Sequence, residues 1–132
     1  MHLHFYENAI ETILLIFLII TFLQSGIDKI KDWKGNLSWL TGHFSKSAFK
    51  NIVAPLLGVV TVVEISAGVL SLIGVVHLLL FDDKSFAFYG GLVSCLALLM
   101  LFFGQRIAKD YEGAKTIVIY LIPSVFLLFL LQ

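Results

Sequence analysis

The sequence predicts an all-α integral membrane protein, folded as a single bundle of four transmembrane helices over residues 1–132. Of its 132 residues, 59% are hydrophobic and only 14% charged, and the mean hydropathy is +0.98. A small water-soluble domain cannot bury that much apolar surface. Four apolar segments also approach the roughly 20 residues that cross about 30 Å of hydrocarbon. They cover residues 9–27, 55–80, 86–103 and 116–131.

The first segment follows an N-terminal stretch without lysine or arginine, so we expect it to stay in the membrane rather than to be cleaved as a signal peptide. Residues 81–85 form a tight turn, which makes the second and third helices antiparallel neighbours. The fourth segment contains Pro123. Because proline lacks a backbone N–H, it frees the carbonyl of Ile119 and predicts a kink.

The long first loop has its own apolar pattern. Trp33, Leu37, Leu40 and Phe44 recur at steps of four, three and four residues, the spacing of one helix face. This predicts a short interfacial helix whose lysines reach anionic lipid. The alternative is an ordered loop with scattered aromatic residues.

The basic residues predict the orientation. Eight of the nine lysines and arginines lie in the first and third loops, and only Lys84 lies on the opposite side. Because cytoplasmic loops are enriched in Lys and Arg, we expect these two loops in the cytoplasm and both termini outside it. The eight are Lys29, Lys31, Lys34, Lys46, Lys50, Arg106, Lys109 and Lys115.

Several function classes are disfavoured. Nine basic residues balance nine acidic ones, so the excess positive charge typical of nucleic-acid binding is missing. With one cysteine, Cys95, the chain has no internal disulfide, redox pair or thiolate cluster. No nucleotide, hydrolase or metalloprotease motif occurs, and His77 lies about 140° around its helix from Glu64. We therefore predict no metal site and no catalytic residue.

Glu64 is the most informative residue. It lies nine positions after Pro55, which at about 1.5 Å per residue places it near the midplane. Thr61, Gly68 and Ser71 share its helix face, so this face points into the bundle. An ionised carboxylate is costly there, and two interpretations remain: a hydrogen bond that joins two helices, or a ligand or proton site.

A second polar stripe ends the first helix, at steps of three, one and three residues, and Lys29 follows it at the membrane surface. Both helices enter from the same side, so Glu64 can meet Gln24 or Lys29, and we predict one polar pocket open to the cytoplasm. Alternatively, Asp28 and Lys29 only mark the helix end. The stripe comprises Thr21, Gln24, Ser25 and Asp28.

The third loop is dense in hydrogen-bonding side chains, namely Gln105, Arg106, Asp110 and Tyr111. Arg106 and Asp110 are four residues apart and can pair. The cluster would close the mouth of the pocket or hold an anion, whereas the alternative is a solvated loop that follows the charge rule.

Three segments resemble the DoxX family of small bacterial membrane proteins: FLQSGIDKI at 22–30, PLLG at 55–58 and EISAGVLSLIGV at 64–75. The resemblance covers nearly the whole chain. It implies a four-helix fold in the bacterial inner membrane and an association with membrane redox assemblies or with their assembly. A fold resemblance does not specify a reaction.

We expect a non-catalytic accessory or assembly subunit of a larger membrane complex, respiratory or redox, with the bilayer and other membrane subunits as partners. The alternative is a module that binds quinone or lipid around Glu64, and no other cofactor is predicted. A third hypothesis, an enzyme or proton-coupled transporter, has one buried carboxylate to support it.

Overall fold

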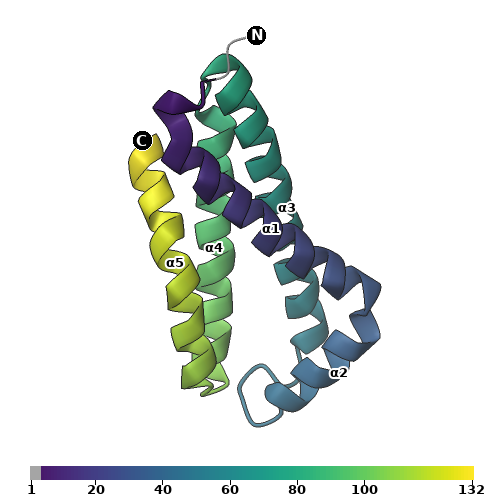
Figure 1. Cartoon of the computed structure of the whole chain (residues 1–132). Coiled ribbons are helices and arrows are strands. Elements are labelled where there is room, and N and C mark those ends of the chain that lie inside the picture. The colour runs from purple at the N-terminus through teal and green to yellow at the C-terminus, as the bar shows by residue number, and fades with distance from the viewer. Residues whose placement is uncertain (1–3) are drawn as a thin grey trace.

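The computed structural model describes residues 4–132, and within this range the chain is all-helical (Figure 1). A short 3-10 turn, η1 (Tyr6–Asn8), precedes five α-helices. These are α1 (Ala9–Lys31), α2 (Trp33–His43), α3 (Val53–Phe81), α4 (Ser85–Ile107) and α5 (Tyr111–Leu131). The expected four-helix bundle is therefore present, with a fifth, shorter helix in the first loop.

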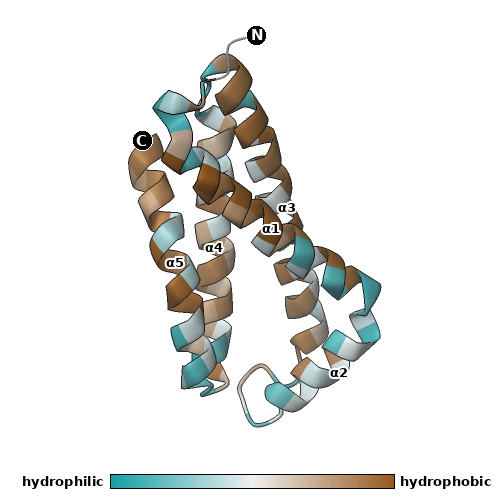
Figure 2. Cartoon of the chain, viewed as in Figure 1, coloured by the Kyte–Doolittle hydropathy of each residue, from teal (hydrophilic) through white to brown (hydrophobic). Residues whose placement is uncertain are grey.

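Within residues 4–132, four helices are long and apolar enough to cross a membrane. They are η1 with α1, then α3, α4 and α5, each corresponding to a predicted segment. Figure 2 shows hydrophobic residues along the middle of the bundle and hydrophilic ones gathered around α2 and the α4–α5 turn. The start of the described chain and its C-terminus lie together at the opposite end (Figure 1).

The predicted helices were too short at the polar end of the bundle. α1 continues to Lys31 rather than 27, and α4 continues to Ile107 rather than 103. α5 begins at Tyr111 rather than 116, because the Asp110 side chain accepts a hydrogen bond from the backbone N–H of Gly113 at 2.9 Å. Hydropathy marks where a helix leaves the hydrocarbon, whereas the helix ends where its cap lies.

The predicted helix in the first loop is α2. Asp32 caps it by accepting a hydrogen bond from Gly35 N at 3.2 Å. The apolar face predicted from Trp33, Leu37, Leu40 and Phe44 is half-buried, and α2 packs against α3 and α1. Trp39, whose ring stacks on His43, is 63% exposed. Protein, rather than lipid alone, therefore covers much of this face.

Glycines set the closest helix contacts. A Cβ atom at Gly90 would lie 2.8 Å from the backbone nitrogen of Ser71, and one at Gly74 would lie 2.5 Å from the Cα of Ala87. The backbones of α3 and α4 therefore approach closely at these two levels, because glycine has no side chain to separate them. The large side chains of the core include Leu15, Leu18, Phe22, Leu78, Leu98 and Leu127.

α5 continues through Pro123 as one helix from Tyr111 to Leu131. One residue later, the Ser124 hydroxyl donates to the carbonyl of Tyr120 at 2.8 Å. A side-chain hydroxyl thus bonds the backbone in the turn where the proline has removed a donor.

We predict that Gly90→Ala destabilises the bundle by about 1–3 kcal/mol, because the new methyl group overlaps the backbone of α3. Equilibrium unfolding in mixed detergent micelles measures the change. The matched control is Gly42→Ala in α2, where an added Cβ meets nothing within 4 Å. Equal stability of the two variants would contradict the helix contact described here.

Candidate functional site

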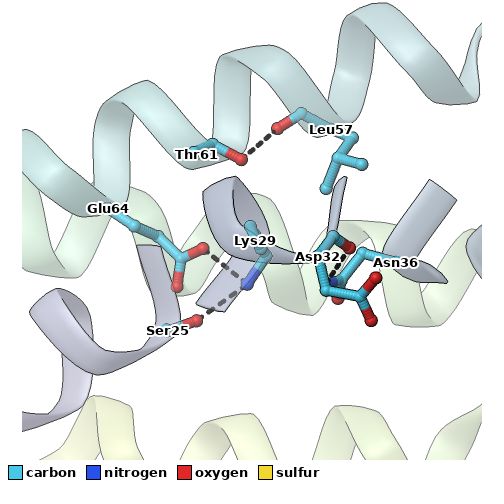
Figure 3. A network of polar contacts seen from close by, with 7 residues as sticks. All are labelled: Ser25, Lys29, Asp32, Asn36, Leu57, Thr61 and Glu64. Carbon is cyan, nitrogen blue, oxygen red and sulfur yellow. Dashed lines mark hydrogen bonds and ion pairs between the residues drawn. The ribbon is translucent and has the colours of Figure 1, made fainter. Parts of the chain in front are cut away.

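The candidate site is built around an ion pair inside the bundle (Figure 3). Lys29 Nζ, from α1, lies 2.8 Å from Glu64 Oε1, from α3, and donates a hydrogen bond of 2.7 Å to Ser25 Oγ. The Glu64 side chain is 2% exposed and the Lys29 side chain 16%. Of the two partners that the sequence offered Glu64, Lys29 is therefore the one in contact.

The contact between the two charges is electrostatic. Glu64 Oε1 lies within ion-pair distance of the ammonium group, and no other residue in the described range donates a hydrogen bond to it. Glu64 is 11 residues into α3, about 17 Å along the helix axis, and so lies well within the hydrocarbon. A carboxylate at that depth needs a positive partner.

Small residues make the pairing geometrically accessible. A Cβ at Gly26 would overlap the side chain of Ile65, and at Gly68 it would lie 2.6 Å from the side chain of Leu23. α1 therefore crosses α3 closely in the turn that follows Glu64. Lys29, one turn after Ser25, reaches back from the helix end along this crossing.

A cavity of about 480 Å³ lies beside the pair. α1 is near α5 at the stacked rings of Phe17 and Tyr120, whose centroids are 5.7 Å apart, and diverges from α5 towards α2 (Figure 1). The cavity occupies the space between these helices and α4. Its polar wall is formed by Thr21, Gln24, Ser25 and Glu64, and its apolar wall includes Phe17, Leu98, Leu101, Ile117 and Tyr120.

The other predicted polar residues lie outside this cavity wall. Asp28 is exposed near the end of α1. The Thr61 hydroxyl is buried and donates to the carbonyl of Leu57 at 2.7 Å. Ser71 is fully buried against Gly90, and its hydroxyl has no hydrogen-bond partner within residues 4–132. Thr61 and Ser71 therefore belong to helix packing.

The third loop is arranged differently from the prediction. Arg106 and Asp110 do not form an ion pair in the described structure, because each has another neighbour. The Arg106 guanidinium lies 4.7 Å above the centre of the Tyr111 ring, and Asp110 caps α5. The side chain of Gln105 lies 2.7 Å, Oε1 to Nε2, from His43, which also lies 3.7 Å from Asp110.

Sequence reasoning missed His43, Phe17 and Tyr120. His43 links α2 to the α4–α5 turn, and its only signal was its position one residue before Phe44 on the predicted apolar face. Phe17 and Tyr120 lie in apolar runs where every position is similar, so nothing in the sequence distinguishes them from lipid-facing residues.

No group of three or more His, Cys, Asp or Glu side chains gathers within residues 4–132 in a way that could hold a metal ion. His2, a histidine near the N-terminus that could also ligate a metal, lies outside the described residues. His77 faces Asp83 at 3.6 Å, near the end of the bundle that carries the C-terminus, far along α3 from Glu64.

Fold and site together define a class: small multi-pass helical membrane proteins with a charged pair inside the bundle. No protein-family model, curated protein or solved structure matches the chain. The function therefore has to be argued from the site itself.

We predict that Glu64→Gln lowers the free energy of unfolding by about 3 kcal/mol, because it leaves a partly buried ammonium group unpaired. Lys29→Met should cost more, since the long lysine side chain can turn to the membrane surface whereas Glu64 cannot. The double variant Lys29→Met, Glu64→Gln should recover most of the loss.

Unfolding in mixed micelles again gives the values, with Glu112→Gln as the matched control. Glu112 pairs with Lys115 at 3.5 Å on the surface, and both side chains are more than two-thirds exposed. Its loss should cost less than about 1 kcal/mol. Additive effects of the two single changes would show that Lys29 and Glu64 do not interact.

Proposed function

We propose that this protein binds a small amphipathic molecule, such as a quinone or a lipid, in the cavity beside Glu64. The observation that carries the proposal is the two-sided lining of the cavity. Hydroxyl, amide and carboxylate groups form one wall, and aromatic and aliphatic side chains form the other. Binding sites for small molecules combine mainly apolar walls with a few placed polar groups in this way.

The polar wall matches a hydrogen-bonding head group. The Ser25 oxygen accepts a hydrogen bond from the ammonium group of Lys29, so the Ser25 hydroxyl proton remains available for donation to a ligand. Thr21 and Gln24 supply another hydroxyl and an amide on the same helix. The apolar wall then covers the ring or chain of the ligand, which can extend between α1 and α5 towards the hydrocarbon.

The resemblance to the DoxX family supports this proposal, because it implies an association with membrane redox assemblies and is carried by segments that contain Ser25, Lys29 and Glu64. We propose membership of that family on the three segments that carry the resemblance. A quinone in this cavity would connect the protein to membrane redox chemistry without a prosthetic group held by the chain itself.

We predict that Ile117→Trp abolishes binding, because the indole fills the cavity from its α5 wall. The matched control is Ile119→Trp on the same helix, where the side chain is exposed to the surroundings of the bundle. Purification in mild detergent, followed by mass spectrometry of extracted small molecules, should detect a ligand with the wild type and the control only. A wild-type protein that carries nothing beyond what the Ile117 variant carries would refute the binding site.

An accessory or assembly subunit remains the second candidate. The observation that favours it is the distribution of the described residues, nearly all of which lie in the four candidate spans and α2. Stoichiometric co-purification with other membrane proteins, lost in Glu64→Gln while the bundle remains folded, would support this role over ligand binding alone.

We infer a bacterial inner-membrane location with α2 and the α4–α5 turn in the cytoplasm. The support is the charge asymmetry: eight of the nine lysines and arginines lie towards that end of the bundle, and Lys84 lies in the turn at the other end.

The inferred orientation predicts which cysteines react in intact cells. In a Cys95→Ser background, Lys84→Cys should react with a membrane-impermeant maleimide, whereas Lys46→Cys should react only after the membrane is permeabilised. The background is mild, because Cys95 is a buried thiol in α4. The reverse pattern of labelling would place α2 outside the cytoplasm.

A further inference from the structure

A second cavity lies beneath α2, at the end of the bundle where the basic residues gather. Its volume is about 250 Å³, and it is bounded by α2, by the start of α3 and by the end of α4. Leu101 lines both this cavity and the Glu64 cavity, and Lys29 lines this one while its ammonium group faces Glu64. The ion pair therefore lies between the two cavities.

The second cavity is apolar on most sides and carries hydrogen-bond donors at its rim. Leu40, Leu57 and Met100 are among its apolar residues, and Trp39 and Phe44 contribute aromatic rings. Its polar residues are Lys29, Asn36, His43 and Gln105.

Among the polar residues, Asn36 has a donor group to spare. Because an amide oxygen only accepts, His43 Nε2 donates to Gln105 Oε1, and the amide nitrogen of Gln105 lies on the side of Gly113 at the start of α5. Asn36 uses one amide N–H on the carbonyl of Asp32 at 2.9 Å and retains another. A ligand that fits this rim therefore offers a hydrogen-bond acceptor, such as a carbonyl oxygen.

The charges around the cavity favour a neutral ligand. Lys29 faces the Glu64 carboxylate at 2.8 Å, and His43 lies 3.7 Å from an oxygen of Asp110. An added anion would compete with these carboxylates, and an added cation would face Lys29. Neither an anionic nor a cationic ligand would therefore find an unpaired opposite charge in the cavity.

We propose that the cavity beneath α2 is a second binding site, which takes a small neutral ring compound bearing a carbonyl acceptor. The volume equals that of about eight liquid waters, enough for one substituted ring but not for a whole lipid. The proposal does not rest on ligand binding beside Glu64, because the two cavities share only Leu101 among their lining residues.

Quenching of Trp39 fluorescence tests the proposal directly, since Trp39 lines the cavity and bromine quenches indole at contact. In a Trp33→Phe background, the probe 4-bromoacetophenone should quench Trp39 saturably in detergent micelles. 4-Bromotoluene, which lacks the carbonyl group, should bind about 2- to 10-fold more weakly, the loss expected for one hydrogen bond.

Two variants that fill the cavity should remove the saturable phase. In Gly104→Leu, the first added carbon lies at an ordinary 3.6 Å from the Phe44 ring, so the helix tolerates it while the rest of the side chain enters the cavity. Val60→Phe fills the cavity from α3. The control Ile117→Phe narrows only the Glu64 cavity and should leave quenching unchanged. Non-saturable quenching in the Trp33→Phe background without a cavity variant would overturn the proposal. Saturable quenching that only Ile117→Phe abolishes would overturn it as well.

Discussion

A carboxylate buried in an apolar bundle needs a positive partner, and in this protein Glu64 of α3 finds it in Lys29 of α1. The need is strict because Glu64 lies about 17 Å along its helix, where hydrocarbon surrounds the bundle. The pair in turn requires α1 to cross α3 closely, which Gly26 and Gly68 permit. Removing one charge leaves the other buried, so the pair constrains the packing of the two helices more than it adds net stability.

The same crossing creates the two cavities. Since α1 packs on α3 and carries Lys29 towards Glu64, it diverges from α5 (Figure 1). The Glu64 cavity lies between these helices. On the other side of the pair, α2 folds back against α3 and covers the second cavity. One electrostatic requirement thus accounts for a polar wall within the membrane and for the separation of the two candidate sites.

The sequence predicted the parts of this arrangement that hydropathy and charge determine. The four spans, the helix in the first loop and the polar face of Glu64 follow from residue spacing. Helix ends were misplaced because they depend on caps such as Asp110, which hydropathy does not detect. The role of Arg106 was misjudged because spacing alone allows its pairing with Asp110, whereas Tyr111 offers its ring face. The cavities could not be predicted, because they depend on helix crossing angles, and these angles cannot be read from a single sequence.

The most direct test of the account is a distance measurement in lipid bilayers. Solid-state NMR can recouple the side-chain nitrogen of ¹⁵N-lysine with the carboxyl carbon of ¹³C-glutamate, and comparison with Glu64→Gln isolates the contribution of this pair. We predict a strong coupling that disappears in the variant, as the 2.8 Å separation of Lys29 Nζ and Glu64 Oε1 requires. A coupling that is absent from the wild type, or unchanged in the variant, would show that Lys29 lies at the membrane surface and that Glu64 is held in another way.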